Sequence, residues 1–219
     1  LTGKTFKDYM QEGIYDGLDA VKKATGEDEV TAIGYCIGGT LMAATLARMA
    51  AQKDDRIKAV TFFAAQADFS DAGELTVFTD EDTLKYLDSL MSEKGYLDGG
   101  EMATTFNMLR ANDLIWSFVV NNYLLGKDPF PFDLLYWNAD STRMPAAMHS
   151  FYLRQMYQEN KLSKGEIELL GTRIDLTKIK LPVFILSTRE DHIAPWKSTY
   201  AATQLYKGPV RFTLAASGH

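Results

Sequence analysis

The stretch that decides the fold runs from residue 30 to residue 47 and reads Val-Thr-Ala-Ile-Gly-Tyr-Cys-Ile-Gly-Gly-Thr-Leu-Met-Ala-Ala-Thr-Leu-Ala. Its first part, from Val30 to Ile33, predicts a short buried strand, and residues 40–47 predict a helix. Between the two stands Cys36, with a glycine two positions away on either side. A strand, a sharp turn around a nucleophile and a helix form a nucleophile elbow, in which small neighbours relieve the crowding around a strained backbone.

Cys36 is the only cysteine of the 219-residue chain, and it has two readings. A free cysteine is often a small buried hydrophobe without reactivity. The flanking glycines and the strand–turn–helix context favour a nucleophile instead, and cysteine in the place of serine indicates acyl chemistry on a thiol. A single cysteine also excludes an internal disulfide framework and a multi-cysteine metal site, so we expect no metal.

Composition and charge narrow the classes of protein further. Apolar content is ordinary for a folded chain, which argues against disorder. The net charge is −6, with acidic and basic residues interspersed, which argues against a nucleic-acid-binding surface. We find no secretory leader and no apolar run long enough to span a bilayer, so we expect a cytoplasmic protein that is not transmembrane. The ends at Leu1 and His219 suggest an internal fragment of a longer protein.

Hydrophobic periodicity divides the chain into an α/β part and an insertion. Residues 1–67 and 181–219 alternate strands and helices, which predicts parallel strands joined by crossover helices. Residues 68–180 do not continue this alternation of strands and helices, and they predict a largely helical cap without a strong strand signal. The expected elements of the α/β part are a helix at 5–25, strands at 30–33, 57–63, 181–187 and 210–214, and helices at 40–53 and 196–206.

Two further residues complete a candidate catalytic set with Cys36. In sites built on a nucleophile elbow the chain order is nucleophile, acid, histidine, with the last two after late strands. Asp191 follows the predicted strand at 181–187, and His219 follows the one at 210–214. A thiol with a pKa of about 8.5 is barely ionised near neutrality. An adjacent imidazole can take its proton, and a carboxylate can orient that imidazole.

Less specific readings of these residues stay open at this point. Asp191 could be an acid near the start of the helix that follows it, and Glu190 competes for its role one position away. His192 is a further titratable neighbour and a candidate substrate contact. His219 could be an ordinary terminal residue. Only the order of the three residues and their places after predicted strands favour the catalytic reading.

Several longer blocks are more specific than the elbow. From about Gly26 to its last residue the chain resembles class I polyhydroxyalkanoate synthases. One departure is Ala111, where a proline is expected. The blocks that carry the resemblance are Gly34-Tyr35-Cys36-Ile37-Gly38-Gly39-Thr40, Asn112-Asp113-Leu114-Ile115-Trp116, Pro131-Phe132-Asp133-Leu134-Leu135-Tyr136-Trp137-Asn138, Arg189-Glu190-Asp191-His192-Ile193-Ala194-Pro195-Trp196 and Ala216-Ser217-Gly218-His219.

The resemblance implies an α/β-hydrolase fold whose first strands lie upstream of this chain, and a definite reaction. Such enzymes polymerise (R)-3-hydroxyacyl groups from coenzyme A thioesters, here with short side chains of the 3-hydroxybutyryl type. Cys36 would accept the acyl group and release coenzyme A, and His219 would generate the thiolate. Asp191 would activate the 3-hydroxyl for chain growth, either directly or through His219. The Ile37 N–H would donate to the oxyanion, with a second donor upstream.

The resemblance also implies partners. Arg110 is a candidate contact for coenzyme A phosphates, because a guanidinium suits them, although an exposed surface arginine is the plainer reading. We expect no cofactor, since coenzyme A is part of the substrate. The partners would be the acyl-coenzyme A, the growing polyester, the surface of the polymer granule and a second copy of the chain in a homodimer. The insertion at 68–180 would act as a lid.

Two other functions remain open from the sequence. One is a cysteine-dependent hydrolase or thioesterase of the same fold, which transfers the acyl group to water. Its product would be a free hydroxy acid and not an insoluble polyester. The other is a non-catalytic binding protein of this fold, which would release no coenzyme A.

Overall fold

A parallel sheet forms the centre of the computed structural model, which describes residues 2–109, 111–129 and 142–219. Its strands lie in the order β1-β2-β7-β8, and each pair of neighbours is parallel. This agrees with the strands predicted from the sequence, although β1 extends two residues further. The strands span Val30–Tyr35 (β1), Ile57–Phe63 (β2), Val183–Thr188 (β7) and Val210–Ala215 (β8).

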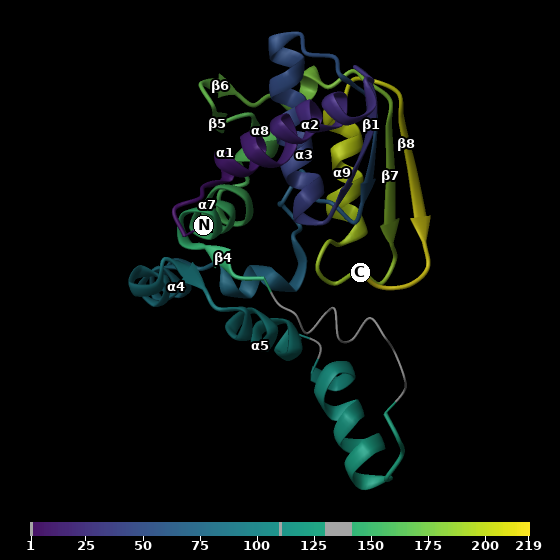
Figure 1. Cartoon of the computed structure of the whole chain (residues 1–219). Coiled ribbons are helices and arrows are strands. Elements are labelled where there is room, and N and C mark those ends of the chain that lie inside the picture. Colours follow the sequence, from purple (N-terminus) through teal and green to yellow (C-terminus); the bar gives the residue numbers. More distant parts are fainter. Residues whose placement is uncertain (1, 110, 130–141) are drawn as a thin grey trace.

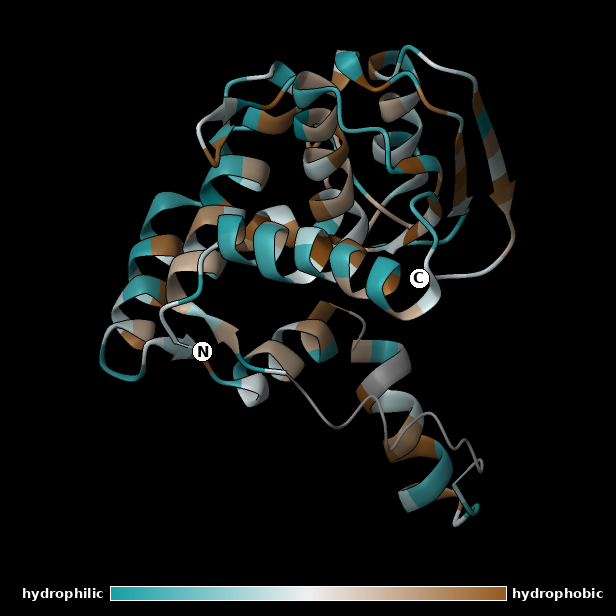
Figure 2. Cartoon of the chain, turned by 45° about the horizontal axis from the view of Figure 1, so that its top comes forward, coloured by the Kyte–Doolittle hydropathy of each residue, from teal (hydrophilic) through white to brown (hydrophobic). Residues whose placement is uncertain are grey.

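Helices cover one face of this sheet. Helices α3 (Ile37–Gln52) and α9 (Trp196–Leu205) lie on the same side of it (Figure 1). On the other face Ile33 and Tyr35 of β1 remain 67% and 51% exposed. Strand β7 is coloured hydrophobic along most of its length, whereas β8 mixes polar and apolar residues (Figure 2), as expected for an inner and an outer strand.

The predicted N-terminal helix forms as one continuous run with a wider turn in its middle. Phe6 and Met10 are almost fully buried against the core, which explains the three- and four-residue apolar spacing. Gly26 ends the run with a φ of 80°, a left-handed conformation that glycine adopts at little cost. The run consists of α1 (Phe6–Asp8), the π-helical η1 (Tyr9–Tyr15) and α2 (Asp16–Thr25).

The middle of the chain is mostly helical, as predicted, but it also contains two short strand pairs that the sequence analysis did not identify. Figure 1 shows its η3–η4 helix projecting away from the rest of the molecule. The elements are η2 (Gly73–Phe78), α4 (Glu81–Lys94), β3 (Tyr96–Leu97), α5 (Gly99–Leu109), η3 (Asn112–Trp116), η4 (Val119–Leu124), β4 (Met144–Pro145), α7 (Ala146–Phe151), η5 (Tyr152–Gln158), α8 (Lys161–Lys164), β5 (Glu168–Leu169), β6 (Thr172–Arg173) and η6 (Leu176–Lys178).

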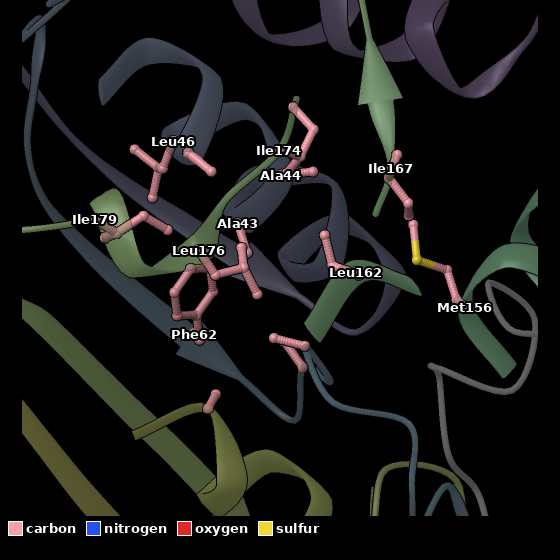
Figure 3. Packing of buried hydrophobic residues seen from close by; sticks show 14 of the residues in the cluster. Ala43, Ala44, Leu46, Phe62, Met156, Leu162, Ile167, Ile174, Leu176 and Ile179 are labelled. Carbon is pink, nitrogen blue, oxygen red and sulfur yellow. The ribbon is translucent and has the colours of Figure 1, made fainter. Parts of the chain in front are cut away.

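Part of the predicted insertion packs within the main core. Leu162, Ile174 and Leu176 are at most 2% exposed and belong to the same apolar cluster as Phe62 of β2 and Ala43 of α3. Figure 3 shows these side chains gathered around α3. The residues from about 144 to 180 thus pack in the main core together with α3. The lid role of residues 68–180 stays a prediction.

His149 is a buried histidine on α7, and packing accounts for its place in the fold. The residue is 4% exposed, and its Nδ1 has no hydrogen-bond partner among the described residues. Burial lowers the pKa of His149 to about 4, although the charge of Asp88 opposes this shift. A folded-state pKa below the ordinary 6.5 means that stability is complete above pH 6.5 and is lost as the pH falls toward 4.

We therefore expect His149→Leu to flatten the acid side of the stability profile. Protonation of His149 in the unfolded chain should cost the native protein about 2 kcal/mol between pH 7 and pH 5, and the leucine variant should not show this loss. Urea unfolding of both proteins at the two pH values measures the difference. The same loss in both proteins would contradict the assignment to His149.

Candidate active site

Cys36 occupies the sharp turn between β1 and α3. Its φ and ψ are 51° and −128°, a conformation that side-chain-bearing residues rarely adopt. Its N–H donates to the carbonyl of Phe63 at the end of β2, at 3.0 Å, and its carbonyl accepts from the N–H of Gly39 at 2.9 Å. Cys36 is therefore fixed to the neighbouring strand on one side and to the first turn of α3 on the other.

The glycines that this turn requires are Gly34 and Gly39. A Cβ at Gly34 would lie 2.6 Å from the Cα of Gly39, and one at Gly39 would lie 2.3 Å from the Cβ of Ala65. Gly38, which the sequence analysis paired with Gly34, has no such neighbour within 4 Å. The close approach of the strand and helix backbones, rather than symmetric spacing around Cys36, thus sets the need for glycine.

Asp191 lies in the loop after β7, with its side chain fully enclosed. One carboxylate oxygen, Oδ1, accepts hydrogen bonds from the N–H groups of Ile193 and Ala194 at 2.9 and 2.8 Å. The other, Oδ2, lies 2.8 Å from Nδ1 of His219. The same carboxylate therefore binds the backbone ahead of α9 and contacts the histidine, and its catalytic role stays a prediction.

His219 lies between this carboxylate and the nucleophile. Burial by itself lowers the pKa of the imidazole, but hydrogen bonds to Asp191 and to the Cys36 thiol, together with the charges of both groups, raise it to about 9. The imidazolium is thus the stable form near neutrality. The role of His219 as a base toward Cys36 stays a prediction. The structure brings Cys36, Asp191 and His219 together in the order predicted.

The other predicted site residues are less well defined. Ile37 is the first residue of α3, so its N–H belongs to the turn whose donors have no intrahelical acceptor, and its oxyanion role stays a prediction. Glu190 is exposed, and it is Asp191 that binds His219. His192 is half-buried beside Asp191, and its contact with substrate stays a prediction. Arg110 lies outside the described residues.

The sequence analysis missed an aromatic group next to the nucleophile. Tyr152 and Tyr157 of η5 contact each other edge to face, with ring centroids 5.4 Å apart, and both pack against Phe69. Burial raises the pKa of both hydroxyls, and the charge of Cys36 contributes to the shift. The Tyr157 hydroxyl also lies 3.4 Å from Oε1 of Gln66. Tyr152 and Tyr157 fall in the stretch that the sequence analysis treated only as part of the helical insertion, so no sequence signal distinguished them.

The fold agrees with a known family. A family model described as the alpha/beta hydrolase fold matches residues 3–219. The chain belongs to this family. A solved structure of a putative non-heme bromoperoxidase BpoC from Mycobacterium tuberculosis H37Rv shares the fold, with a TM-score of 0.55 and 11% identity over 99% of this chain and 68% of that one. Such a likeness concerns the fold alone.

Closer relatives confirm the resemblance to polyhydroxyalkanoate synthases. The chain is 56% identical over 216 residues to the poly(3-hydroxyalkanoate) polymerase subunit PhaC of Rhizobium meliloti (strain 1021), and the match covers 99% of the chain. It is also 56% identical over 216 residues to the poly(3-hydroxyalkanoate) polymerase of Methylorubrum extorquens, again over 99% of the chain. These matches cover 35% and 36% of the two relatives, so the chain spans about a third of their length.

The raised pKa of His219 gives a direct test of the site. The chain has three histidines, so a pH titration of their ring signals by NMR is tractable, and a His219→Gln variant assigns the signal. The His219 signal should titrate near pH 9, and Asp191→Asn should lower this midpoint because it removes the charge on Oδ2. Glu190→Gln is the matched control and should leave it unchanged. An unchanged midpoint in Asp191→Asn would contradict the geometry described here.

Proposed function

We propose that Cys36, His219 and Asp191 form an acyl-transfer site and that the protein containing this chain polymerises (R)-3-hydroxyacyl-coenzyme A into a polyester. The observation that carries the proposal is the contact of the His219 imidazole with the Asp191 carboxylate on one side, with the Cys36 thiol of the sharp β1–α3 turn close enough to influence the same ring. The similarity to two poly(3-hydroxyalkanoate) polymerases supports the choice of substrate class. We propose short side chains of the 3-hydroxybutyryl type and release of coenzyme A.

The first half-reaction loads the enzyme. His219 takes the proton of the Cys36 thiol, and the thiolate attacks the thioester carbonyl of the substrate. The oxyanion that forms is stabilised by the Ile37 N–H at the start of α3, where the helix dipole also favours negative charge. The carbon–sulfur bond to coenzyme A then breaks, and the leaving thiolate takes the proton from the imidazolium. The acyl group remains on Cys36 as a thioester.

The second half-reaction lengthens the polymer. A 3-hydroxyl group gives its proton to His219 and attacks the thioester carbonyl, which forms an ester bond and releases the Cys36 thiolate. Both oxygens of Asp191 already accept hydrogen bonds, and its side chain has no exposed surface. This favours a role for Asp191 through His219 over direct contact with the hydroxyl. The scheme requires no cofactor, since coenzyme A enters as part of the substrate.

The proposed partners follow from the reaction. They are the acyl-coenzyme A, the growing polyester with its granule surface and a second copy of the chain, and the granule would lie in the cytoplasm. Among the described residues, no helix combines the length and apolar character needed to cross a bilayer. We propose that residues 68–180 include the lid over the site, with the portion after residue 144 as its fixed base.

Replacement of Cys36 tests its proposed role as the nucleophile. In the complete gene product, Cys36→Ala should abolish coenzyme A release from (R)-3-hydroxybutyryl-coenzyme A, because the attacking atom is lost. Cys36→Ser should be severely impaired, since a hydroxyl ionises much less readily than a thiol. Release of coenzyme A and precipitation of polyester are measured together. Free hydroxy acid without polyester would favour the thioesterase alternative, and near-normal turnover by Cys36→Ala would remove the assignment.

The role of Asp191 can be resolved by measuring each half-reaction. If Asp191 acts only by orienting His219, Asp191→Asn should slow single-turnover acylation and later elongation by similar factors, whereas His219→Gln should block acylation. Quenched-flow release of the first coenzyme A reports acylation, and the rate of polymer growth reports elongation. A variant that acylates normally but does not elongate would show that Asp191 acts directly on the hydroxyl.

A further inference from the structure

The segment that carries His219 has little regular structure of its own. Strand β8 ends at Ala215, four residues before the histidine, and the residues that follow form a bend outside the sheet. Within it Ser217 has a φ of 102°, which side-chain-bearing residues rarely adopt. A segment of this kind takes its position from neighbouring groups, so the contacts around residues 216–219 determine where the imidazole lies.

The main anchor comes from the end of β7. The side-chain hydroxyl of Thr188 donates to the carbonyl of Gly218 at 2.7 Å, and the N–H of Glu190 donates to the carbonyl of Ser217 at 3.0 Å. Thr188 is the last residue of β7 and pairs with Ala215 of β8. Its hydroxyl therefore ties the peptide group directly before His219 to the strand that leads to Asp191.

A second contact comes from the strand of the nucleophile. The ring of Tyr35 packs against the imidazole of His219, with centroids 5.3 Å apart and planes inclined by 36°. Tyr35 directly precedes Cys36 and lies half exposed on the uncovered face of the sheet. The groups that face the imidazole are thus Asp191, Cys36 and Tyr35, and the imidazole side chain is left only 16% exposed.

We propose that Thr188 and Tyr35 are positioning residues for His219: the Thr188 hydroxyl fixes the backbone of the histidine, and the Tyr35 ring fixes its plane. Asp191 alone binds one ring nitrogen and leaves the imidazole free to swing about that hydrogen bond. The two additional contacts restrict this rotation and hold the second nitrogen toward Cys36. The inference rests on the proposed pairing of His219 with Cys36 but not on the identity of the acyl substrate.

The experiment uses the complete gene product, in which alkylation of Cys36 by iodoacetamide is followed between pH 6 and pH 10 by mass spectrometry of the peptide that contains Cys36. Thr188→Val keeps the branched shape and removes the hydroxyl, and it should slow alkylation at pH 7 by about threefold to tenfold. Thr188→Ser should restore the rate. Tyr35→Leu should slow it by a similar factor, about threefold to tenfold, whereas Tyr35→Phe should not. Thr25→Val loses a comparable hydroxyl–carbonyl bond on α2 and should have no effect.

A double-mutant comparison distinguishes positioning from general loosening of the fold. In a His219→Gln background there is no imidazole to position, so adding Thr188→Val or Tyr35→Leu should change the alkylation rate no further. Equal slowing with and without His219 would overturn the proposal, as would wild-type rates in both single variants. These outcomes do not depend on polymer formation. Failure to make polyester with intact, His219-dependent alkylation would refute the proposed function and leave the positioning roles standing.

Discussion

The positive φ of Cys36 is the constraint on which the rest of the site depends. A residue with a side chain tolerates this conformation only if the surroundings enforce it, because it costs about 1–3 kcal/mol. Here the strand and the helix that flank Cys36 approach so closely that neither Gly34 nor Gly39 has room for a Cβ. The hydrogen bond from Cys36 to Phe63 then attaches the turn to β2. The strained backbone at Cys36 is thus maintained by backbone packing and not by the side chains of Asp191 and His219.

The carboxylate of Asp191 links the candidate site to the start of α9. Its two oxygens serve different purposes, since one binds the backbone ahead of α9 and the other binds His219. Any movement of α9 away from the sheet would therefore displace the acid as well. Helix α3 also serves two purposes, since it supplies both the proposed oxyanion donor and the apolar surface against which residues 160–180 pack. Asp191 and α3 thus contribute both to the stability of the fold and to the proposed acyl-transfer site.

Local sequence signals were sufficient to predict the main sheet, the sharp turn at Cys36 and the order of the three candidate site residues. Buried strands are short apolar runs, and the order of the residues along the chain fixes which strand ends meet. The signals failed where structure depends on distant contacts. Nothing local distinguishes Gly39 from Gly38, since the difference comes from the approach of Ala65 and of the Gly34 backbone. The sequence analysis gave Tyr35 no role beyond its place in the turn motif, because its contact with His219 joins residues 184 positions apart. The prediction for Arg110 lies outside the described residues.

The pairing of β2 with β7 has a consequence for how the protein is made. Phe62 lies beside Ile185 in the sheet, although the whole middle of the chain separates them in the sequence. During synthesis at about 5–20 residues per second, Cys36 leaves the ribosome roughly eight to thirty seconds before Asp191. Until β7 and β8 dock, neither Asp191 nor His219 can lie beside Cys36, so the three residues come together only late in synthesis.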